Sequence, residues 1–297
     1  MTLSAKVRKY GVLGSVKLGW QRLVMRHYLE FKWRSEPLYV NPTEQELMHI
    51  EDDLLSVGLR LSSFTVNTHE LDSFKRTFKF PPDYHGGENS GVWEEKILEH
   101  FLAYELCELS KASKEDIYID VAGAASPWAK MLREKGYQAY SVDLDIEEKY
   151  KTLSYYLQEN ATATSFPKAS VRACSLQCAF EMFIGNDDLL FIDECRRMLI
   201  DNGVVVIAPL YLHTHHCGYS TLEHYAKGYA DKGSKEYIRK DCWGIPFSRK
   251  YSPKLLKDRV IARIENQGMK YELYKLSNRE ELGKNVYCHF ILKIIRN

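Results

Sequence analysis

The feature that most constrains the fold is an alternation of short apolar runs and helical segments from about residue 116 to the C-terminus. Residues 204–210, VVVIAPL, are apolar throughout, as is typical of a strand buried on both faces of a parallel sheet. Further strands are expected at 117–121, 139–144, 171–176, 271–276 and 288–295, and helices at 128–135 and 187–200. Because strands that alternate with helices form βαβ units, the pattern predicts an α/β fold with a doubly wound, mostly parallel sheet.

Helices dominate the first 110 residues. Thr43 and Glu46 have the spacing of a capping box, which predicts a helix that ends near Gly58. Beyond it we expect a strand at 59–66, helices at 68–78 and 92–109, and a turn-rich loop at 81–91. We therefore predict two domains, a mainly helical N-terminal extension at 1–110 and an α/β domain at 111–297 with an insertion at 211–252.

Charge and cysteine content limit the class of protein. The 297 residues include 41 basic and 40 acidic side chains, so no global field attracts nucleic acid, and we expect no nucleic-acid partner. The seven cysteines are odd in number and form no C-x-x-C pair, which favours reduced thiols. The sequence has neither an apolar run of about 18 residues nor the apolar block of a signal peptide. We expect a soluble cytoplasmic protein.

Residues 1–34 form a basic segment with eight lysines and arginines and one acid, Glu30, which leaves a net charge of +7. A helical spacing relates Val16, Trp20, Leu23, His27 and Phe31, so the second half of the segment is predicted to be an amphipathic helix. We expect this helix to pack on the α/β domain with a solvated basic face. The alternative is weak contact with a membrane surface, with Trp20, Phe31 and Trp33 among the lipid headgroups.

The turn after the first α/β strand is the first candidate ligand site, because ligands of such sheets bind outside the carboxyl ends of the strands. The small side chains of residues 122–126, AGAAS, allow a tight turn and a close approach to main-chain N–H groups at the helix start. The second strand ends in Asp143 and Asp145, and an acid there can accept hydrogen bonds from both ribose hydroxyls of an adenosine. These two features leave NAD and S-adenosylmethionine as alternative ligands.

Several segments together resemble the class I S-adenosylmethionine-dependent methyltransferases. IYIDVAGAAS at 117–126 resembles the first motif of that family, and VDLD at 142–145 resembles the end of its second strand. Residues 160–167, NATATSFP, are similar to the stretch that meets the adenine. Residues 173–183 resemble the fourth strand and the element after it, and 187–209 follow the family's E-x-x-R-V-L-K-P-G-G pattern. The matching segments occur in the family's order.

The resemblance implies a Rossmann-like methyltransferase fold and S-adenosylmethionine as the cofactor, with Asp143 at the ribose and Asn160 at the adenine. The cofactor-binding residues that it implies are Asp120, Ala122, Gly123, Ala124, Ser126, Asp143, Leu144, Asn160, Ala161 and Ser175. The sequence departs from the family where Ala122, Ala124 and Ser126 replace glycines and Asn160 replaces an acid. A non-catalytic binding protein is therefore one alternative. An NAD-dependent oxidoreductase is another, although neither a glycine-rich turn nor a Tyr-x-x-x-Lys pair supports it.

Methyl transfer itself needs mainly in-line placement of the acceptor, because the sulfonium is already activated. A hydroxyl acceptor also needs a base to take its proton. We predict that His213, His216 or His85 is that base, since an imidazole titrates near neutral pH. The acceptor pocket is expected between the loop at 83–87 and the segment at 213–216, for a small molecule or saccharide methylated at oxygen. Histidines near Cys217 suggest a metal, but their spacing matches no standard zinc pattern, and we predict none.

Overall fold

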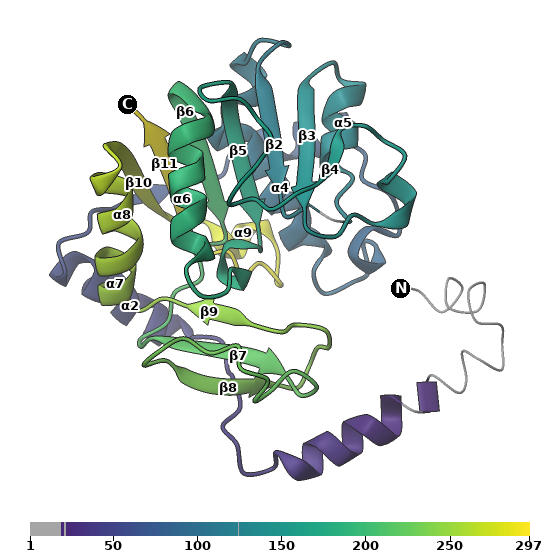
Figure 1. The fold of residues 1–297 in the computed structure, drawn as a ribbon, viewed down its shortest axis with the longest axis vertical. Helices are drawn as coiled ribbons and strands as arrows, with labels where there is room; N and C mark the ends of the chain where they lie inside the picture. Colours follow the sequence, from purple (N-terminus) through teal and green to yellow (C-terminus); the bar gives the residue numbers. More distant parts are fainter. Residues whose placement is uncertain (1–18, 21, 124) are drawn as a thin grey trace. The chain divides into compact units, whose positions relative to one another are not determined.

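An eight-stranded sheet organises the larger of two compact units in this computed structural model, which describes residues 19–297 except residues 21 and 124 (Figure 1). The larger unit comprises residues 42–216 and 249–297. The strand order is β1-β10-β11-β6-β5-β2-β3-β4. Their bounds are β1 (Leu61–Phe64), β2 (Ile117–Val121), β3 (Gln138–Asp143), β4 (Tyr156–Gln158), β5 (Val171–Gln177), β6 (Leu199–Ala208), β10 (Met269–Leu276) and β11 (Phe290–Arg296).

Seven of these strands run in one direction. Only β11 is antiparallel to its neighbours β6 and β10. From β2 the chain moves outward through β3 and β4, then crosses to β5 on the other side of β2 and continues to β6. The strand order therefore reverses between β2 and β5, which is where a doubly wound sheet binds its ligand. The predicted doubly wound, mostly parallel sheet is confirmed.

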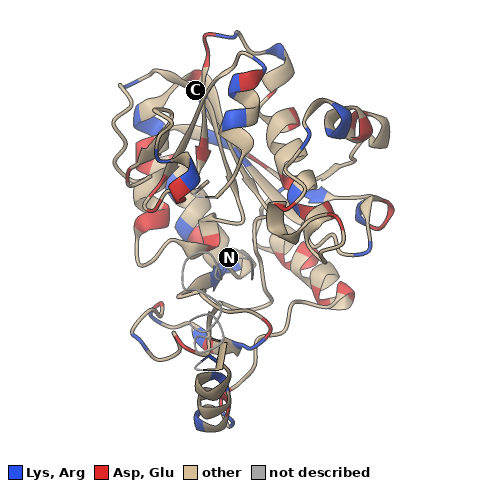
Figure 2. Cartoon of the chain, turned by 90° about the vertical axis from the view of Figure 1, so that its right-hand side faces the viewer, with Lys and Arg blue, Asp and Glu red and all other residues tan. Residues whose placement is uncertain are grey.

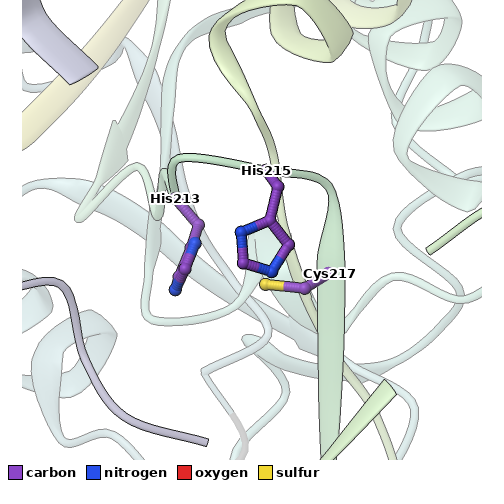
Figure 3. A group of neighbouring side chains, drawn as sticks. All are labelled: His213, His215 and Cys217. Carbon is purple, nitrogen blue, oxygen red and sulfur yellow. The ribbon is translucent and has the colours of Figure 1, made fainter. Parts of the chain in front are cut away.

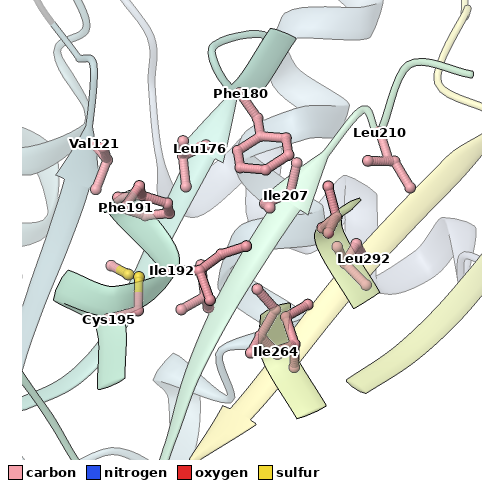
Figure 4. Close-up of a cluster of buried hydrophobic side chains, with 14 of the residues drawn as sticks. Val121, Leu176, Phe180, Phe191, Ile192, Cys195, Ile207, Leu210, Ile264 and Leu292 are labelled. Carbon is pink, nitrogen blue, oxygen red and sulfur yellow. The ribbon is translucent and has the colours of Figure 1, made fainter. Parts of the chain in front are cut away.

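Helices cover both faces of this sheet. One face carries α2 (Glu44–Ser56), α6 (Asp187–Met198), α7 (Pro253–Leu255), the π-helix η5 (Leu256–Ile261) and α8 (Ala262–Asn266); the other carries α3 (Thr68–Thr77), α4 (Trp93–Leu106) and α5 (Trp128–Glu134). Successive residues of β6 point to opposite faces, so Val205 and Ile207 belong to one cluster and Val204 and Val206 to the other. Figure 4 shows Phe191, Ile192 and Cys195 in the first cluster, with the strand residues Val121, Leu176 and Ile207. This packing on both faces explains why the strands are nearly continuous apolar runs.

The N-terminal helices are not a separate domain. The capping box of α2 is present, with the N–H of Glu46 donating to Thr43 Oγ1 at 3.3 Å and the N–H of Thr43 donating to Glu46 Oε2 at 2.8 Å. However, β1 pairs in parallel with β10, and α2 and α4 fill the two cores of the sheet. The structural division of the chain therefore does not follow the predicted boundary at residue 110. Short elements complete this unit: η1 (Tyr84–Gly86), η2 (Leu109–Lys111), η3 (Glu148–Tyr150), η4 (Phe180–Met182) and α9 (Arg279–Leu282).

The smaller unit joins the N-terminal residues, up to 41, with residues 217–248, which form most of the predicted insertion. In it β7 (Cys217–Thr221) and β8 (Lys235–Arg239) pair in parallel, and Leu38 bridges to Ile238. The short strand β9 (Ser248–Lys250) begins where the chain leaves this unit. Residues 19–20 and 22–32 are helical, as predicted, and Val16 lies outside the described residues.

The apolar side chains of this N-terminal helix differ from our expectation. We expected Trp20, Leu23 and Phe31 to be packed, but all three are exposed, because the helix contacts its own unit through other side chains, such as Arg26. In the described part of the chain, no helix combines the length and apolar character needed to cross a membrane.

Candidate cofactor and acceptor site

The turn after β2 lies at the point where the strand order reverses. A Cβ atom on Gly123 would lie 2.5 Å from Asp120 Oδ2 and 2.7 Å from Ser141 Oγ, so only glycine fits this position. Ala122 has a φ of 59°, in the left-handed region that favours glycine, although its side chain is exposed. The Oγ of Ser126 accepts a hydrogen bond from the N–H of Trp128, the first residue of α5, at 3.1 Å. The turn thus keeps a glycine where close packing requires one.

Asp120 lies buried beneath this turn. Its Oδ2 atom accepts no hydrogen bond from the described residues, which is costly for a buried carboxyl oxygen. Burial raises the pKa of Asp120 to about 7, the hydrogen bond from Ser126 lowers it, and the charge of Asp143 raises it further. A carboxyl group with this pKa is partly neutral at pH 7, so it can donate as well as accept a hydrogen bond. An unsatisfied polar atom in this position fits a site that is completed by a polar ligand.

Asp143 and Leu144 end β3 beside the same turn. Asp143 is half-buried, and one of its oxygens, Oδ1, accepts the N–H of Asp145 at 2.9 Å. Leu144 is 68% exposed, which is unusual for a leucine at the end of a buried strand. Asp143 offers a carboxylate fixed by a hydrogen bond, which suits a ribose. The exposed apolar side chain of Leu144 follows it and suits the base attached to that ribose. Ala124, which the resemblance also implied, lies outside the described residues.

Asn160 is less suited to its expected role than the sequence suggested. Its Oδ1 atom accepts both the N–H of Thr162, at 3.0 Å, and the Thr162 hydroxyl, at 2.9 Å. Because a carbonyl oxygen has two lone pairs, the acceptor that we expected to meet an adenine amino group is already used. The exposed Asn160 can still offer its NH₂ group to an acceptor nitrogen. Ala161, next to it, is buried.

Ser175 is fully buried in β5, as Asp120 is in β2. Its Oγ is hydrogen-bonded to the Tyr118 hydroxyl and accepts from Gln177 Nε2 at 2.6 Å. The Tyr118 hydroxyl also accepts the indole N–H of Trp128 at 3.0 Å. This network lies on the face of the sheet that α4 and α5 cover, so the Ser175 hydroxyl stabilises the interior.

A second polar group lies at the carboxyl ends of β5 and β6, where α4 passes over them. The Nζ atom of Lys96 donates to both oxygens of Glu99, at 3.0 and 2.9 Å. Cys178 follows β5, and its thiol donates to Glu99 Oε1 at 2.9 Å while its Sγ lies 3.1 Å from the Tyr211 hydroxyl. The Tyr287 hydroxyl donates to the same Glu99 oxygen at 3.4 Å. We call Lys96, Glu99, Cys178, Tyr211 and Tyr287 the polar cluster.

The charges in the polar cluster are unusual for a protein interior. Burial and the charge of Glu99 raise the pKa of the Cys178 thiol, so this group stays protonated and donates. Burial alone would lower the pKa of Lys96, but the carboxylate of Glu99 raises it above its usual value. Glu95, one turn before Glu99, accepts the N–H groups of Tyr287 and Cys288 at 2.9 and 3.1 Å. Burial and Glu99 raise the pKa of Glu95 to about 8, so it is mostly neutral at pH 7.

Our sequence analysis did not single out Glu99. A signal was present in α4, WEEKILEHFLAYEL, whose apolar residues occur all around the helix. A helix of this kind is buried on most sides, so Glu95 and Glu99, four residues apart, have to lie in the interior on one face. Buried charged residues in such a helix indicate a functional site more strongly than an exposed loop does.

The structure places the three predicted bases in two segments. His213 is buried, and its backbone N–H donates to the backbone carbonyl of Tyr251 at 2.9 Å. His216 is half-buried and follows three residues later. His85 is exposed at a left-handed φ of 47°, with its ring against Tyr84 at 4.5 Å between centroids. Desolvation of the ring and the charge of Lys96 lower the pKa of His85 to about 4, which makes it a weak base at neutral pH.

Figure 3 shows His213, His215 and Cys217, alternate residues of one five-residue stretch. The rings of His213 and His215 meet edge to face at 4.4 Å, and the Thr214 hydroxyl lies 3.2 Å from Nδ1 of each. One nitrogen or sulfur atom from each of the three residues lies within 4.8 Å of the others, close enough to share a metal ion. Three ligands can hold a catalytic zinc, so the prediction that the protein has no metal needs a direct test.

The segment that carries the turn, Asp143, Asn160 and Cys178 also matches a family model. That model, described as a methyltransferase domain, covers residues 119–207, from β2 to β6. Residues 119–207 therefore match the family of methyltransferase domains. S-adenosylmethionine is its cofactor, and the unsatisfied Asp120 oxygen, the glycine-only position 123 and the held Asp143 carboxylate fit such a group.

Several solved structures are similar to this chain at low sequence identity. The 1,6-didemethyltoxoflavin-N1-methyltransferase of Burkholderia thailandensis, solved with 1,6-didemethyltoxoflavin and S-adenosylhomocysteine, is 12% identical with a TM-score of 0.46, over 80% of this chain and 94% of that one. The YcgJ protein of Bacillus subtilis is 12% identical with a TM-score of 0.40, over 67% and 99%. A SAM-dependent methyltransferase of Methanosarcina mazei is 13% identical with a TM-score of 0.40, over 63% and 94%. No curated protein is similar enough in sequence to match this chain.

Proposed function

We propose that the methyltransferase domain transfers the methyl group of S-adenosylmethionine to a hydroxyl group of a small molecule or saccharide. The observation that carries this proposal is the polar cluster, which gathers hydroxyl, carboxylate and ammonium groups at the ends of β5 and β6. These strand ends adjoin the reversal between β2 and β5, where the cofactor residues lie. An acceptor placed there meets donors and acceptors that can orient a hydroxyl group.

The residues of this site have separable tasks in the reaction. When bound, S-adenosylmethionine supplies an activated methyl group, which forms a C–O bond while its C–S bond breaks. Tyr211 and Tyr287 can hold the acceptor by hydrogen bonds. A base has to take the hydroxyl proton as the C–O bond forms. His213 and His216 remain our candidates for it, and Glu99 is an additional one because its carboxylate lies within the polar cluster.

The runner-up is a methyltransferase-like protein that binds a ligand without catalysis. It is favoured by alanine and serine at glycine positions of the first motif, and Ala122 does adopt a left-handed φ. The strain at this one residue is on the order of 1–2 kcal/mol, which the fold evidently accommodates. Since glycine is kept at position 123, where a side chain cannot fit, the turn supports a working cofactor site.

Two measurements on the full chain test the proposal. Calorimetry with S-adenosylhomocysteine and with NAD should show binding of the first only, and this binding should weaken in Asp143→Ala. Methyl-labelled S-adenosylmethionine is then offered with hydroxylated saccharides and phenols, and with amines of matched size. Label transferred to hydroxyl acceptors is the expected result. Transfer to amines alone would contradict the assignment to oxygen, and binding of S-adenosylhomocysteine with no transfer to any acceptor would favour the non-catalytic alternative.

A further inference from the structure

The helical residues 19–20 and 22–32 of the smaller unit present an apolar stripe to solvent. Trp20, Val24, Tyr28 and Phe31 follow one another at spacings of three or four residues, so they share one face of the helix. Trp20 is 66% exposed and Phe31 69%, and Leu23, Val24 and Tyr28 are also exposed. Trp20, Val24, Met25 and Tyr28 line a common apolar hollow. Scattered apolar residues are ordinary on a surface, but a contiguous stripe of aromatic residues marks an interaction site.

The contacts that hold this helix to its unit come from its other side. The guanidinium group of Arg26 donates to the Lys240 carbonyl at 3.0 Å and pairs with Glu30 at 2.9 Å. Just after the helix, the ring of Trp33 meets Tyr225 at 5.1 Å between centroids. The apolar stripe therefore is not the surface by which the helix is attached.

Positive charge accompanies the stripe. Arg22, Lys32 and Arg34 are exposed, while Glu30, the only acid in residues 1–34, is paired with Arg26. Figure 2 shows lysine and arginine in blue along this helix. The guanidinium carbon of Arg34 lies 4.3 Å from the Phe31 ring centroid, and Lys32 Nζ lies 4.4 Å from that of Trp33. Cationic groups thus lie directly beside the exposed aromatic rings. In sequence, residues 1–34 together carry a net charge of +7 although the whole chain carries only +1.

We propose that this helix binds the surface of an anionic lipid membrane, lying in the plane of the headgroups with Trp20, Val24, Tyr28 and Phe31 among the upper acyl chains. A helix with an apolar aromatic stripe and flanking basic residues matches such an interface, because tryptophan and tyrosine suit the headgroup level and each basic residue is attracted to anionic lipid. A protein partner would have to be acidic as well as apolar, whereas an anionic bilayer presents both properties over its entire surface.

The test is flotation of the full chain with vesicles of phosphatidylcholine alone and of phosphatidylcholine with phosphatidylserine. We expect binding to the anionic vesicles only, weakened by high salt. Trp20→Ser/Phe31→Ser should reduce the bound-to-free ratio at least tenfold. Arg22→Gln/Lys32→Gln should reduce it about fivefold for each charge removed. Met48→Ser/Leu55→Ser, a pair of exposed apolar residues on α2, is the matched control and should leave it unchanged.

Three outcomes would overturn the proposal. The first is equal binding to both kinds of vesicle, and the second is no binding by the unaltered chain, neither of which depends on a variant that folds. The third is a concentration-dependent dimer in sedimentation that Trp20→Ser/Phe31→Ser abolishes while vesicle binding stays absent, which would assign the stripe to a second copy of the chain. Circular dichroism of each variant establishes that a loss of binding is not a loss of fold.

Discussion

The thiol of Cys178 donates a hydrogen bond of 2.9 Å to Oε1 of Glu99 and so joins the end of β5 to the middle of α4. Cys178 itself has a left-handed φ of 51°, a conformation that favours glycine. The Nζ atom of Lys96 donates hydrogen bonds to both oxygens of the same carboxylate. The acceptor end of the methyltransferase domain is therefore built around a buried charge pair, and its stability depends on both partners.

Removing one partner of this pair should destabilise the fold strongly. Glu99→Gln leaves the Lys96 ammonium buried without a counter-charge, so we expect the free energy of unfolding to fall by about 3–5 kcal/mol. The double variant Lys96→Met/Glu99→Leu should recover most of that loss, because no buried charge remains. Urea unfolding measures both. Glu94→Gln, an exposed glutamate of the same helix, should change stability by no more than about 0.5 kcal/mol. A double variant as unstable as the single one would contradict this account.

Asp143 should control the affinity for the cofactor. Asp143→Ala removes the carboxylate expected at the ribose hydroxyls, and S-adenosylhomocysteine affinity should fall by about 1–3 kcal/mol, or roughly 5- to 150-fold. Calorimetry measures the change. Asp145→Ala is the control, because only the N–H of Asp145 contacts Asp143 Oδ1 and the substitution keeps that group. If Asp145→Ala loses affinity for S-adenosylhomocysteine and Asp143→Ala does not, the ribose contact belongs to residue 145.

Asp120 should make the stability of the cofactor-free protein depend on pH. Its pKa rises from 3.8 to about 7 on folding, so folding favours the neutral form. The stabilisation is complete below pH 4 and is lost as the pH rises toward 7, because Asp120 ionises in the unfolded chain over this interval while it stays mostly neutral in the folded one. Between pH 4 and pH 7 the free energy of unfolding of the unaltered protein, measured in urea, should fall by on the order of 4 kcal/mol relative to that of Asp120→Asn. Curves that stay parallel from pH 4 to pH 7 would show that Asp120 is ionised at little cost.

The predicted bases can be ranked by turnover. His213→Gln or His216→Gln should reduce turnover about a hundredfold and leave S-adenosylhomocysteine affinity almost unchanged. His85→Gln should have a smaller effect, because a pKa of about 4 makes His85 a weak base. If turnover survives all three substitutions, Glu99 becomes the candidate base.

We expect that turnover requires no metal ion. Turnover should be unchanged after dialysis against a chelator. A loss that added zinc restores, and that His215→Ala makes permanent, would instead establish a metal at His213, His215 and Cys217. The matched control is His49→Ala, an exposed histidine of α2.

Replacing Ala122 of the first motif by glycine should not destabilise the protein. Ala122→Gly removes a left-handed alanine, and we expect it to stabilise the protein by up to about 1 kcal/mol. Ala163→Gly, in an exposed loop where φ is not positive, should instead destabilise by a few tenths of a kcal/mol. Thermal unfolding of the two variants compares them directly. Destabilisation by both would mean that the Ala122 side chain makes a favourable contact.

The sequence alone predicted most strands of the sheet and the segments expected to bind the cofactor. Local information was sufficient for these predictions, because apolar runs alternate with helices of period 3.6, and because the turn and Asp143 lie at the ends of strands. The predicted strand at 117–121 has the observed bounds, and the capping box of α2 is present. The sequence could not show that Asn160 Oδ1 is taken by Thr162, since that depends on the local backbone conformation.

Tertiary structure alone decided which residues meet at the acceptor end. Glu99 lies 79 residues before Cys178, and Tyr287 lies 109 residues after it, so only the packing of α4 across β5 and β6 brings them together. The same holds for the division into units, because strand pairing between β1 and β10 attaches the N-terminal helices to the sheet. Sequence patterns report the period of a segment and the burial of its faces. They do not report which distant segment covers a face, because that choice depends on the free energy of packing of the whole chain.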